Sequence, residues 1–99
     1  MNTISGKVIQ IIPEVSGTTE RGEWIRGGFV IESLTETDNR IAIEVFGHEK
    51  IEWVRGLSIG EVVIVDYRVS SRFFLDKWFT SAQLVRLMKS QKMEVPNVG

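Results

Sequence analysis

The stretch RIAIEVFGHEKIEWVRG, residues 40–56, changes its periodicity at Gly47. Before that glycine, apolar residues stand at every second position, which is the pattern of a half-buried strand. In this alternation Phe46 falls on the opposite face, the one that carries the charged residues. After the glycine, HEKIEWVRG has the apolar spacing of a short helix that ends at Gly56. The stretch therefore predicts a strand over residues 40–46 and a short helix near residues 49–55.

On both sides of this stretch, β-branched runs alternate with turn signals, which predicts further strands. They cover residues 3–12, closed by Pro13, residues 24–34, residues 62–70 and residues 78–87. Three strands, a short helix and two strands are the element order of the OB-fold, a Greek-key barrel. We expect an all-β protein: a five-stranded OB-fold Greek-key barrel with one short helix between strands 3 and 4.

Glycines stand where a small barrel needs bulges and tight bends, notably Gly6, Gly60 and the pair Gly27 and Gly28. No repeat or second domain is visible in the sequence. We expect one OB-fold domain over residues 1–88 and a flexible C-terminal tail over residues 89–99. Trp53, on the predicted helix, is expected to close one end of the barrel.

Composition describes an ordinary globular chain of 99 residues, with 42% hydrophobic and 25% charged residues. It has no cysteine, so nothing ties it to an oxidising compartment. The first residues lack the features of a secretory signal, and no apolar run approaches the ~20 residues that a spanning helix needs. We therefore expect a cytoplasmic protein without a membrane partner.

The charge is unevenly distributed along the chain. The formal net charge is −1, which argues against a strong, purely electrostatic binder of nucleic acid. Residues 67–99, however, contain six basic and two acidic side chains. This basic third is either a solvated surface or a place where phosphates bind.

The sequence resembles the bacterial single-stranded DNA-binding proteins in RIAIEVFG, the short helix, LSIGEVVIVDYRVSSR and the hairpin that leads into KWFTSAQLV. The segments ISGKVIQIIPEVSG and WIRGGFVIE are closer still to a family of short bacterial OB-fold proteins of unknown function. The resemblance covers residues 3–87. It implies that Phe46 is a base-stacking ring on the outer face of the third strand. It also implies a partner: single-stranded DNA more than RNA.

Alternation on the fourth strand places Val63, Val65 and Val69 inward, and Ile64, Asp66, Arg68 and Ser70 outward. The hairpin SRFFLDKW then adds a cluster of basic and aromatic residues. Together these patterns predict nucleic-acid-binding residues on several strands: Trp24, Arg26, Arg40, Phe46, Arg68, Arg72, Phe74, Lys77 and Trp78.

Several of these residues have a second interpretation. Phe74 and Trp78 can simply pair across the hairpin and cap the barrel. The direction of Trp24 and Arg26 stays open, because a bulge at the glycine pair would reverse it. Phe46 can instead pack against a second copy of the chain.

Outward apolar residues also favour self-association as a dimer or tetramer, with Val30, Ile64 and Phe46 in the contact. The alternative function is then an oligomeric protein–protein interaction module that uses the same aromatic face.

Residues for enzyme chemistry are scarce in this sequence. The single histidine, His48, stands at the start of the predicted helix, and there is no thiolate to join it in a metal site. No glycine-rich phosphate loop leads from a strand into a long helix. We expect a non-enzymatic protein with no catalytic residue, no metal site and no cofactor.

Overall fold

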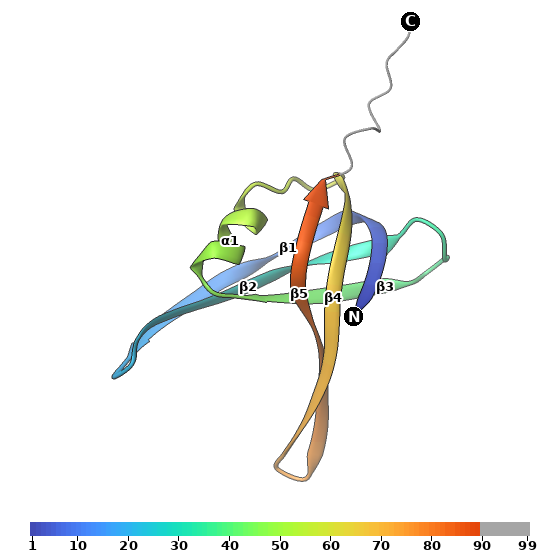
Figure 1. The fold of residues 1–99 in the computed structure, drawn as a ribbon. Coiled ribbons are helices and arrows are strands. Elements are labelled where there is room, and N and C mark those ends of the chain that lie inside the picture. Colours follow the sequence, from blue (N-terminus) through green and yellow to red (C-terminus); the bar gives the residue numbers. More distant parts are fainter. Residues whose placement is uncertain (90–99) are drawn as a thin grey trace, which may run out of the picture.

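The computed structural model describes residues 1–89, which form five strands and one helix (Figure 1). The helix α1 (His48–Arg55) lies between β3 and β4 in the chain. The strands are β1 (Asn2–Thr19), β2 (Gly22–Ser33), β3 (Arg40–Phe46), β4 (Val62–Phe74) and β5 (Lys77–Lys89). Of the tail predicted at residues 89–99, all but the first residue lies outside the described residues.

The strands form a closed barrel in the order β1-β2-β3-β5-β4. All neighbours are antiparallel except β3 and β5, which are parallel and share a short register, Ile43 with Ala82 and Glu44 with Gln83. β1 closes the barrel because it pairs with β2 and with β4. The predicted five-stranded OB-fold barrel, with its one helix between strands 3 and 4, is confirmed.

β1 is longer than the sequence predicts. Pro13 does not end it: β1 continues to Thr19 and pairs with β2 as far as Gly22. Pro13 lies within a register shift between Ile12 and Val15, where an extra residue on β1 interrupts the ladder. A residue without a backbone N–H is tolerated at such a bulge. The proline therefore bends β1 and does not terminate it.

The glycine pair on β2 serves close packing. Both register shifts between β1 and β2 add a residue to β1, so the bulges are not on β2, and only the shift between Ile12 and Val15 lies opposite the pair. A Cβ on Gly28 would lie 2.3 Å from the carbonyl oxygen of Ile43, a backbone atom that cannot move aside. Only glycine allows β2 and β3 to approach this closely.

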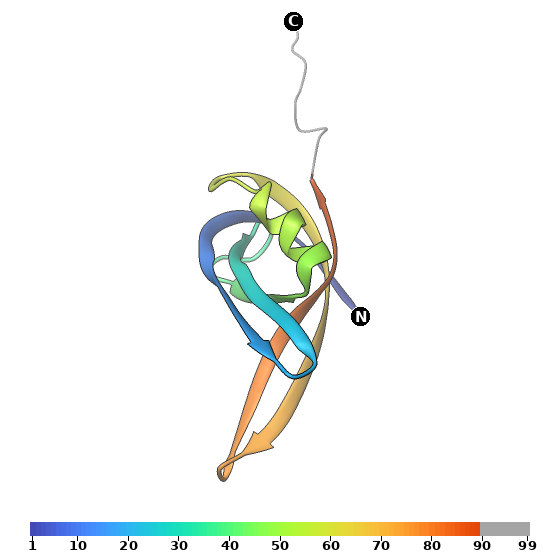
Figure 2. The same cartoon turned by 90° about the vertical axis from the view of Figure 1, so that its left-hand side faces the viewer.

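The core fills the barrel and extends under α1. It consists of Val8, Ile25, Phe29, Ile31, Ile43, Val45, Ile51, Val54, Leu57, Val63, Val65 and Leu84. From α1, Ile51 and Val54 are buried, whereas Trp53 is only partly buried against this core. The helix therefore closes its end of the barrel with two buried aliphatic residues, and Trp53 packs against the core beside them. In both views, α1 lies far from the tip of the β4–β5 hairpin (Figures 1 and 2).

The side-chain directions on β4 follow the predicted alternation, but the burial differs from it at two positions. Val63 and Val65 are fully buried, as predicted. Asp66 points outward yet is buried, because Thr3 and Arg86 cover it. Val69 has the inward phase but is 50% exposed, because β4 has passed the end of the barrel there.

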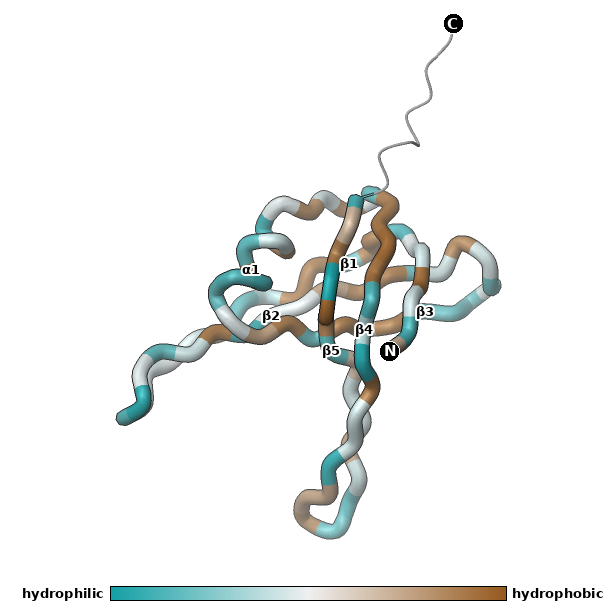
Figure 3. Tube along the Cα trace, in the orientation of Figure 1, coloured by the Kyte–Doolittle hydropathy of each residue, from teal (hydrophilic) through white to brown (hydrophobic). Residues whose placement is uncertain are grey.

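Two hairpins project beyond the barrel (Figure 1). We call residues 15–26 the β1–β2 arm and residues 69–82 the β4–β5 arm. Coloured by hydropathy, the tip of the β1–β2 arm is mostly hydrophilic, and apolar residues gather near the tip of the β4–β5 arm (Figure 3). The two arms therefore offer different chemistry to a partner.

Candidate nucleic-acid interface

Phe46 is the last residue of β3, and its side chain is 50% exposed. It points away from the core because the neighbouring Val45 is fully buried, as the alternation predicts. Its direct partner on β2 is Arg26. Directly opposed residues of antiparallel strands point to the same side, so the Arg26 side chain leaves the sheet beside Phe46.

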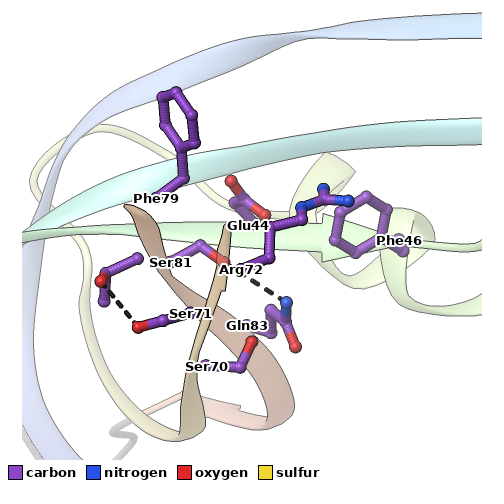
Figure 4. A pocket seen from close by; sticks show the side chains of 9 residues that line it. Glu44, Phe46, Ser70, Ser71, Arg72, Phe79, Ser81 and Gln83 are labelled. Atoms are coloured by element: carbon purple, nitrogen blue, oxygen red, sulfur yellow. Dashed lines mark hydrogen bonds between the residues drawn. The ribbon is translucent and has the colours of Figure 1, made fainter. Parts of the chain in front are cut away.

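A groove of about 470 Å³ separates the end of β3 from the β4–β5 arm. It exists because β3 and β5 pair over only two positions before the arm diverges. Figure 4 shows the Arg72 side chain extending from β4 towards Phe46, with Glu44 and Gln83 nearby. The groove is lined by Glu44, Phe46, Ser70, Ser71, Arg72, Phe79, Thr80, Ser81 and Gln83.

A smaller hollow of about 150 Å³ adjoins this groove at Phe46. Phe46 and Gln83 line both, and the hollow adds Arg68 and Lys50. Lys50 donates a hydrogen bond to the carbonyl oxygen of Leu84, with 3.1 Å between the two atoms. One aromatic ring thus lines both a hollow with Arg68 and a groove with Arg72.

Among the described residues, the guanidinium groups of Arg68 and Arg72 have no acidic partner. Neither forms an ion pair within residues 1–89, in contrast to Arg40, whose Nε lies 3.4 Å from a carboxylate oxygen of Glu32. Among residues 1–89, Glu44 supplies the one carboxylate that lines the groove, and it forms no ion pair with Arg72. The groove and the adjoining hollow therefore offer an anion two cations that are not held in ion pairs within this part of the chain.

Trp24 and Arg26 lie beside the groove and do not line it. The central carbon of the Arg26 guanidinium lies 5.8 Å from the centre of the Trp24 ring, within the range of a cation–π contact. The ring also covers Gly17, where a Cβ would lie 2.6 Å from a ring carbon. The sequence left open to which side of the sheet Trp24 and Arg26 point. Because Arg26 opposes Phe46, they point to the side of the sheet where the groove lies.

The β4–β5 arm separates the aromatic cluster predicted from SRFFLDKW. Phe74 is opposed to Lys77, whereas Trp78 is opposed to Phe73. The rings of Phe73 and Trp78 are 5.3 Å apart between centres, at 57° to each other. Phe74 and Trp78 therefore do not pair. The arm projects away from the barrel and does not cap it (Figure 1). This corrects the second interpretation of the hairpin.

Only part of the predicted interface is brought together. Phe46, Arg68 and Arg72 meet in the connected groove and hollow. Phe74 and Lys77 lie further along the arm, on the same face as Arg72.

Two predicted residues lie elsewhere. Arg40 lines a different groove of about 460 Å³, next to Tyr67 and Val69. Trp78 points to the opposite face of the arm from Arg72.

Sequence reasoning missed Phe79 and Gln83, which line the groove from β5. The signal was present, because both share the alternating phase of Lys77 along KWFTSAQ. The phase alone did not show that this side of β5 faces Phe46.

The groups with shifted pKa values lie outside the groove and tie elements together. Hydrogen bonds from Thr3 and Arg86, at 2.7 and 3.1 Å, hold the pKa of Asp66 below its usual value. In the same way, two hydrogen bonds from Arg55 lower the pKa of Glu14 and join α1 to β1.

Within residues 1–89, no group of three or more His, Cys, Asp or Glu side chains is placed to hold a metal ion. His48 is the exposed first residue of α1. In the same part of the chain, no helix has the length and apolar character to cross a membrane.

Comparison with known proteins agrees with this architecture. A family model described as "Domain of unknown function (DUF3127)" matches residues 3–88. Among solved structures, the fold is similar to that of a small single-stranded DNA-binding protein from Streptomyces coelicolor. The TM-score is 0.50 at 14% sequence identity, over 94% of this chain and 95% of that one. No curated protein matches the chain in sequence. The resemblance drawn from the sequence is confirmed at the level of family and fold.

Proposed function

We propose that the chain, which belongs to the DUF3127 family, binds single-stranded DNA without enzymatic activity and with low sequence specificity. One observation carries this proposal: Phe46 is an exposed ring that lines both a hollow with Arg68 and a groove with Arg72. The ring supplies a stacking surface, and the two guanidinium groups supply phosphate contacts.

Stacking on Phe46 explains the low specificity. Every base has a π-face, so a ring on an exposed sheet stacks on any base, at about 1 to 3 kcal/mol per base. The groove offers few groups for reading base edges. Besides hydroxyls, its hydrogen-bonding side chains are Glu44, Gln83 and Arg72, and Arg72 is assigned to phosphate. Stacking on Phe46 therefore contributes to affinity and does not depend on which base is bound.

Phosphate binding is expected to be modest. On the groove side of the β4–β5 arm the cations are Arg68, Arg72 and Lys77, and the net charge of the whole chain is −1. If each cation contacts one phosphate, the slope of log affinity against log salt is about −2, since a single strand contributes about −0.7 per contact. Stacking then provides a large share of the affinity.

DNA is preferred over RNA in this proposal because the structural neighbour is a single-stranded DNA-binding protein. A chain without cysteine is compatible with the reducing cytoplasm, where we place it.

A fluorescence anisotropy titration with labelled oligothymidylate at low salt tests the proposal. Phe46→Ala should weaken binding by about 1 to 3 kcal/mol, because one stacked base is lost. Phe46→Tyr is the matched control, since it keeps a ring at the same place and should bind like the wild type. If the wild-type protein binds no oligonucleotide at low salt, or if Phe46→Ala binds equally well, the proposal is wrong.

A further inference from the structure

The β4–β5 arm has two faces with different chemistry. Opposed residues of its antiparallel strands share a face, so the register assigns every side chain. The basic face contains Arg68, Ser70, Arg72, Phe74, Lys77, Phe79, Ser81 and Gln83. The neutral face contains Val69, Ser71, Phe73, Trp78, Thr80 and Ala82. The basic face belongs to the proposed nucleic-acid interface. Of the neutral face, Ser71 and Thr80 also line the groove, whereas Val69, Phe73, Trp78 and Ala82 do not.

The neutral face continues the lining of the barrel out into solvent. On β4, its phase begins with the fully buried Val65 and the partly buried Tyr67. Beyond the barrel the same phase is exposed, at 50% for Val69 and 56% for Phe73. Opposite Phe73 on β5, Trp78 is 69% exposed. The residues that this phase buries in the barrel are thus followed by aromatic residues that nothing within residues 1–89 covers.

The hydroxyl groups of the neutral face are already satisfied. The hydroxyls of Ser71 and Thr80 lie 2.8 Å apart and form a hydrogen bond with each other. Burying a hydrogen-bonded pair avoids the penalty of an unsatisfied polar group. The face contains no charged side chain. It is therefore suited to contact with another apolar surface.

The arm also requires support. A two-stranded ribbon without other packing is marginally stable at best in water. The arm from Ser70 to Ser81 has this form, because β3 pairs with β5 only at Ala82 and Gln83. A partner that covers the neutral face would supply the missing third layer.

Charge indicates which partner fits. If two copies met through their basic faces, three cations from each would lie close together and repel. Two neutral faces meet without such repulsion, and their rings can pack on one another. We infer that the neutral face pairs two copies of this chain, arm against arm, about a two-fold axis. In such an isologous contact the same surface serves both partners.

This pairing leaves both basic faces open on the outside of the dimer, and it does not depend on nucleic-acid binding. It also differs from the contact predicted from the sequence, which used Val30, Ile64 and Phe46. Val30 and Ile64 are only partly exposed, and Phe46 lies in the groove. That earlier contact stays a prediction.

Cysteine cross-linking tests the pairing directly, because the chain has no cysteine of its own. Ser71→Cys places a thiol in the middle of the neutral face, close to the inferred axis, and Ser70→Cys places it on the basic face one residue away. With a short bis-maleimide, Ser71→Cys should give a covalent dimer in at least tenfold higher yield than Ser70→Cys. Equal yields, or no dimer from Ser71→Cys, would overturn the inference.

Sedimentation equilibrium provides a second measurement. The wild-type protein should be a dimer at tens of micromolar. The double variant Phe73→Ser with Trp78→Ser should raise the dimer dissociation constant at least tenfold. The control pair Phe74→Ser with Phe79→Ser, on the basic face, should leave it unchanged. A wild-type monomer, or a dimer that only the control pair disrupts, contradicts the inference.

The two proposals can fail separately. A dimer that binds no oligothymidylate leaves the pairing intact and removes the proposed function. A wild-type monomer that binds oligothymidylate removes the pairing and keeps the function.

Discussion

The β1–β2 arm and the β4–β5 arm are both two-stranded ribbons that extend beyond the barrel (Figures 1 and 3). The tip of the first, TTERGE, is polar and contains two acids and one base. The tip of the second, RFFLDKWF, contains four aromatic rings, two bases and one acid. The same backbone arrangement therefore presents an acidic tip in one arm and a basic, aromatic surface in the other. Only the second suits a polyanion.

The arms are also anchored differently. Near the base of the β1–β2 arm, Glu14 is joined to Arg55 of α1 on the protein surface, at 2.8 Å. In the wall from which the β4–β5 arm extends, the buried Asp66 is joined to Thr3 of β1 and Arg86 of β5. The second anchor links three strands of the barrel, whereas the first links a helix to one strand.

Shortening the β4–β5 arm should have the largest effect on the affinity for oligothymidylate, and shortening the β1–β2 arm is its control. Ser70 opposes Ser81, so residues 71–80 can be replaced by Asn-Gly, which forms a two-residue hairpin turn. This removes Arg72 and Lys77, and charge-assisted hydrogen bonds contribute roughly 1.5 to 3 kcal/mol each, so affinity for oligothymidylate should fall at least ~100-fold. The matched control replaces residues 18–23 by Asn-Gly between Gly17 and Trp24, and should change affinity less than ~3-fold. Anisotropy titrations measure both, and equal losses would remove the distinction between the arms.

Reversing one charge on the β4–β5 arm should have the next largest effect on binding, and the same reversal on the β1–β2 arm is its control. Arg72→Glu removes one cation from the groove and introduces repulsion, which should cost about 1.5 to 3 kcal/mol of binding and lower the salt slope by about 0.7. Arg21→Glu, at the turn of the β1–β2 arm, should leave both quantities nearly unchanged. Titrations at several salt concentrations give both values. A smaller loss for Arg72→Glu than for Arg21→Glu would exchange the roles of the two arms.

Acid should distinguish the two anchors. The pKa of Asp66 is lowered in the folded state, so its contribution to stability is complete above the ordinary aspartate value and is lost as the pH falls through the lowered pKa. Urea unfolding of Asp66→Asn should show lower stability than the wild type at pH 7, and this difference should shrink at the lowest pH. Glu14→Gln should lose less stability at pH 7, because the Glu14 carboxylate that it replaces lies on the surface. If Glu14→Gln costs more stability than Asp66→Asn, the ranking of the anchors is wrong.

The smallest effect is expected at the root of the β1–β2 arm. In Gly17→Ala the new Cβ would lie 2.6 Å from the Trp24 ring, so the ring must tilt on this exposed surface. We expect a change in tryptophan fluorescence with at most about 0.5 kcal/mol of stability lost, as for most surface substitutions. Binding of oligothymidylate should stay within about 3-fold of the wild type. A larger loss would place Trp24 inside the interface and extend the site onto this arm.

The pairing across the β4–β5 turn shows why part of the site escaped sequence reasoning. The aromatic pair Phe74 with Trp78 requires a three-residue loop, whereas the observed turn has two residues, Leu75 and Asp76, both with positive φ. Two central residues in the left-handed backbone region are typical of a type I′ hairpin turn, and a leucine at the first of them does not indicate such a turn. A shift of one residue in the turn moves each ring to the other face of the ribbon.

Pro13 and Val69 show a second limit. The rule that proline ends a strand failed because a bulge in β1 tolerates a residue without an N–H. Alternation placed Val69 in the correct phase but did not reveal that the barrel ends before it. Both errors concern what lies beside a strand, and a pattern along one strand contains no information about its neighbours.

The sequence by itself determined the strands, the helix between β3 and β4 and the outward direction of Phe46. It also determined that the basic side chains are concentrated in the last third of the chain. These follow from alternation and turn residues, which act within a few neighbouring positions. Only the tertiary structure decided that Phe46 and Arg72, far apart in the chain, share one groove, and that the β4–β5 arm has a basic and a neutral face. The physical reason is that register, strand divergence and barrel closure depend on contacts between distant segments, and these contacts decide which side chains face one another.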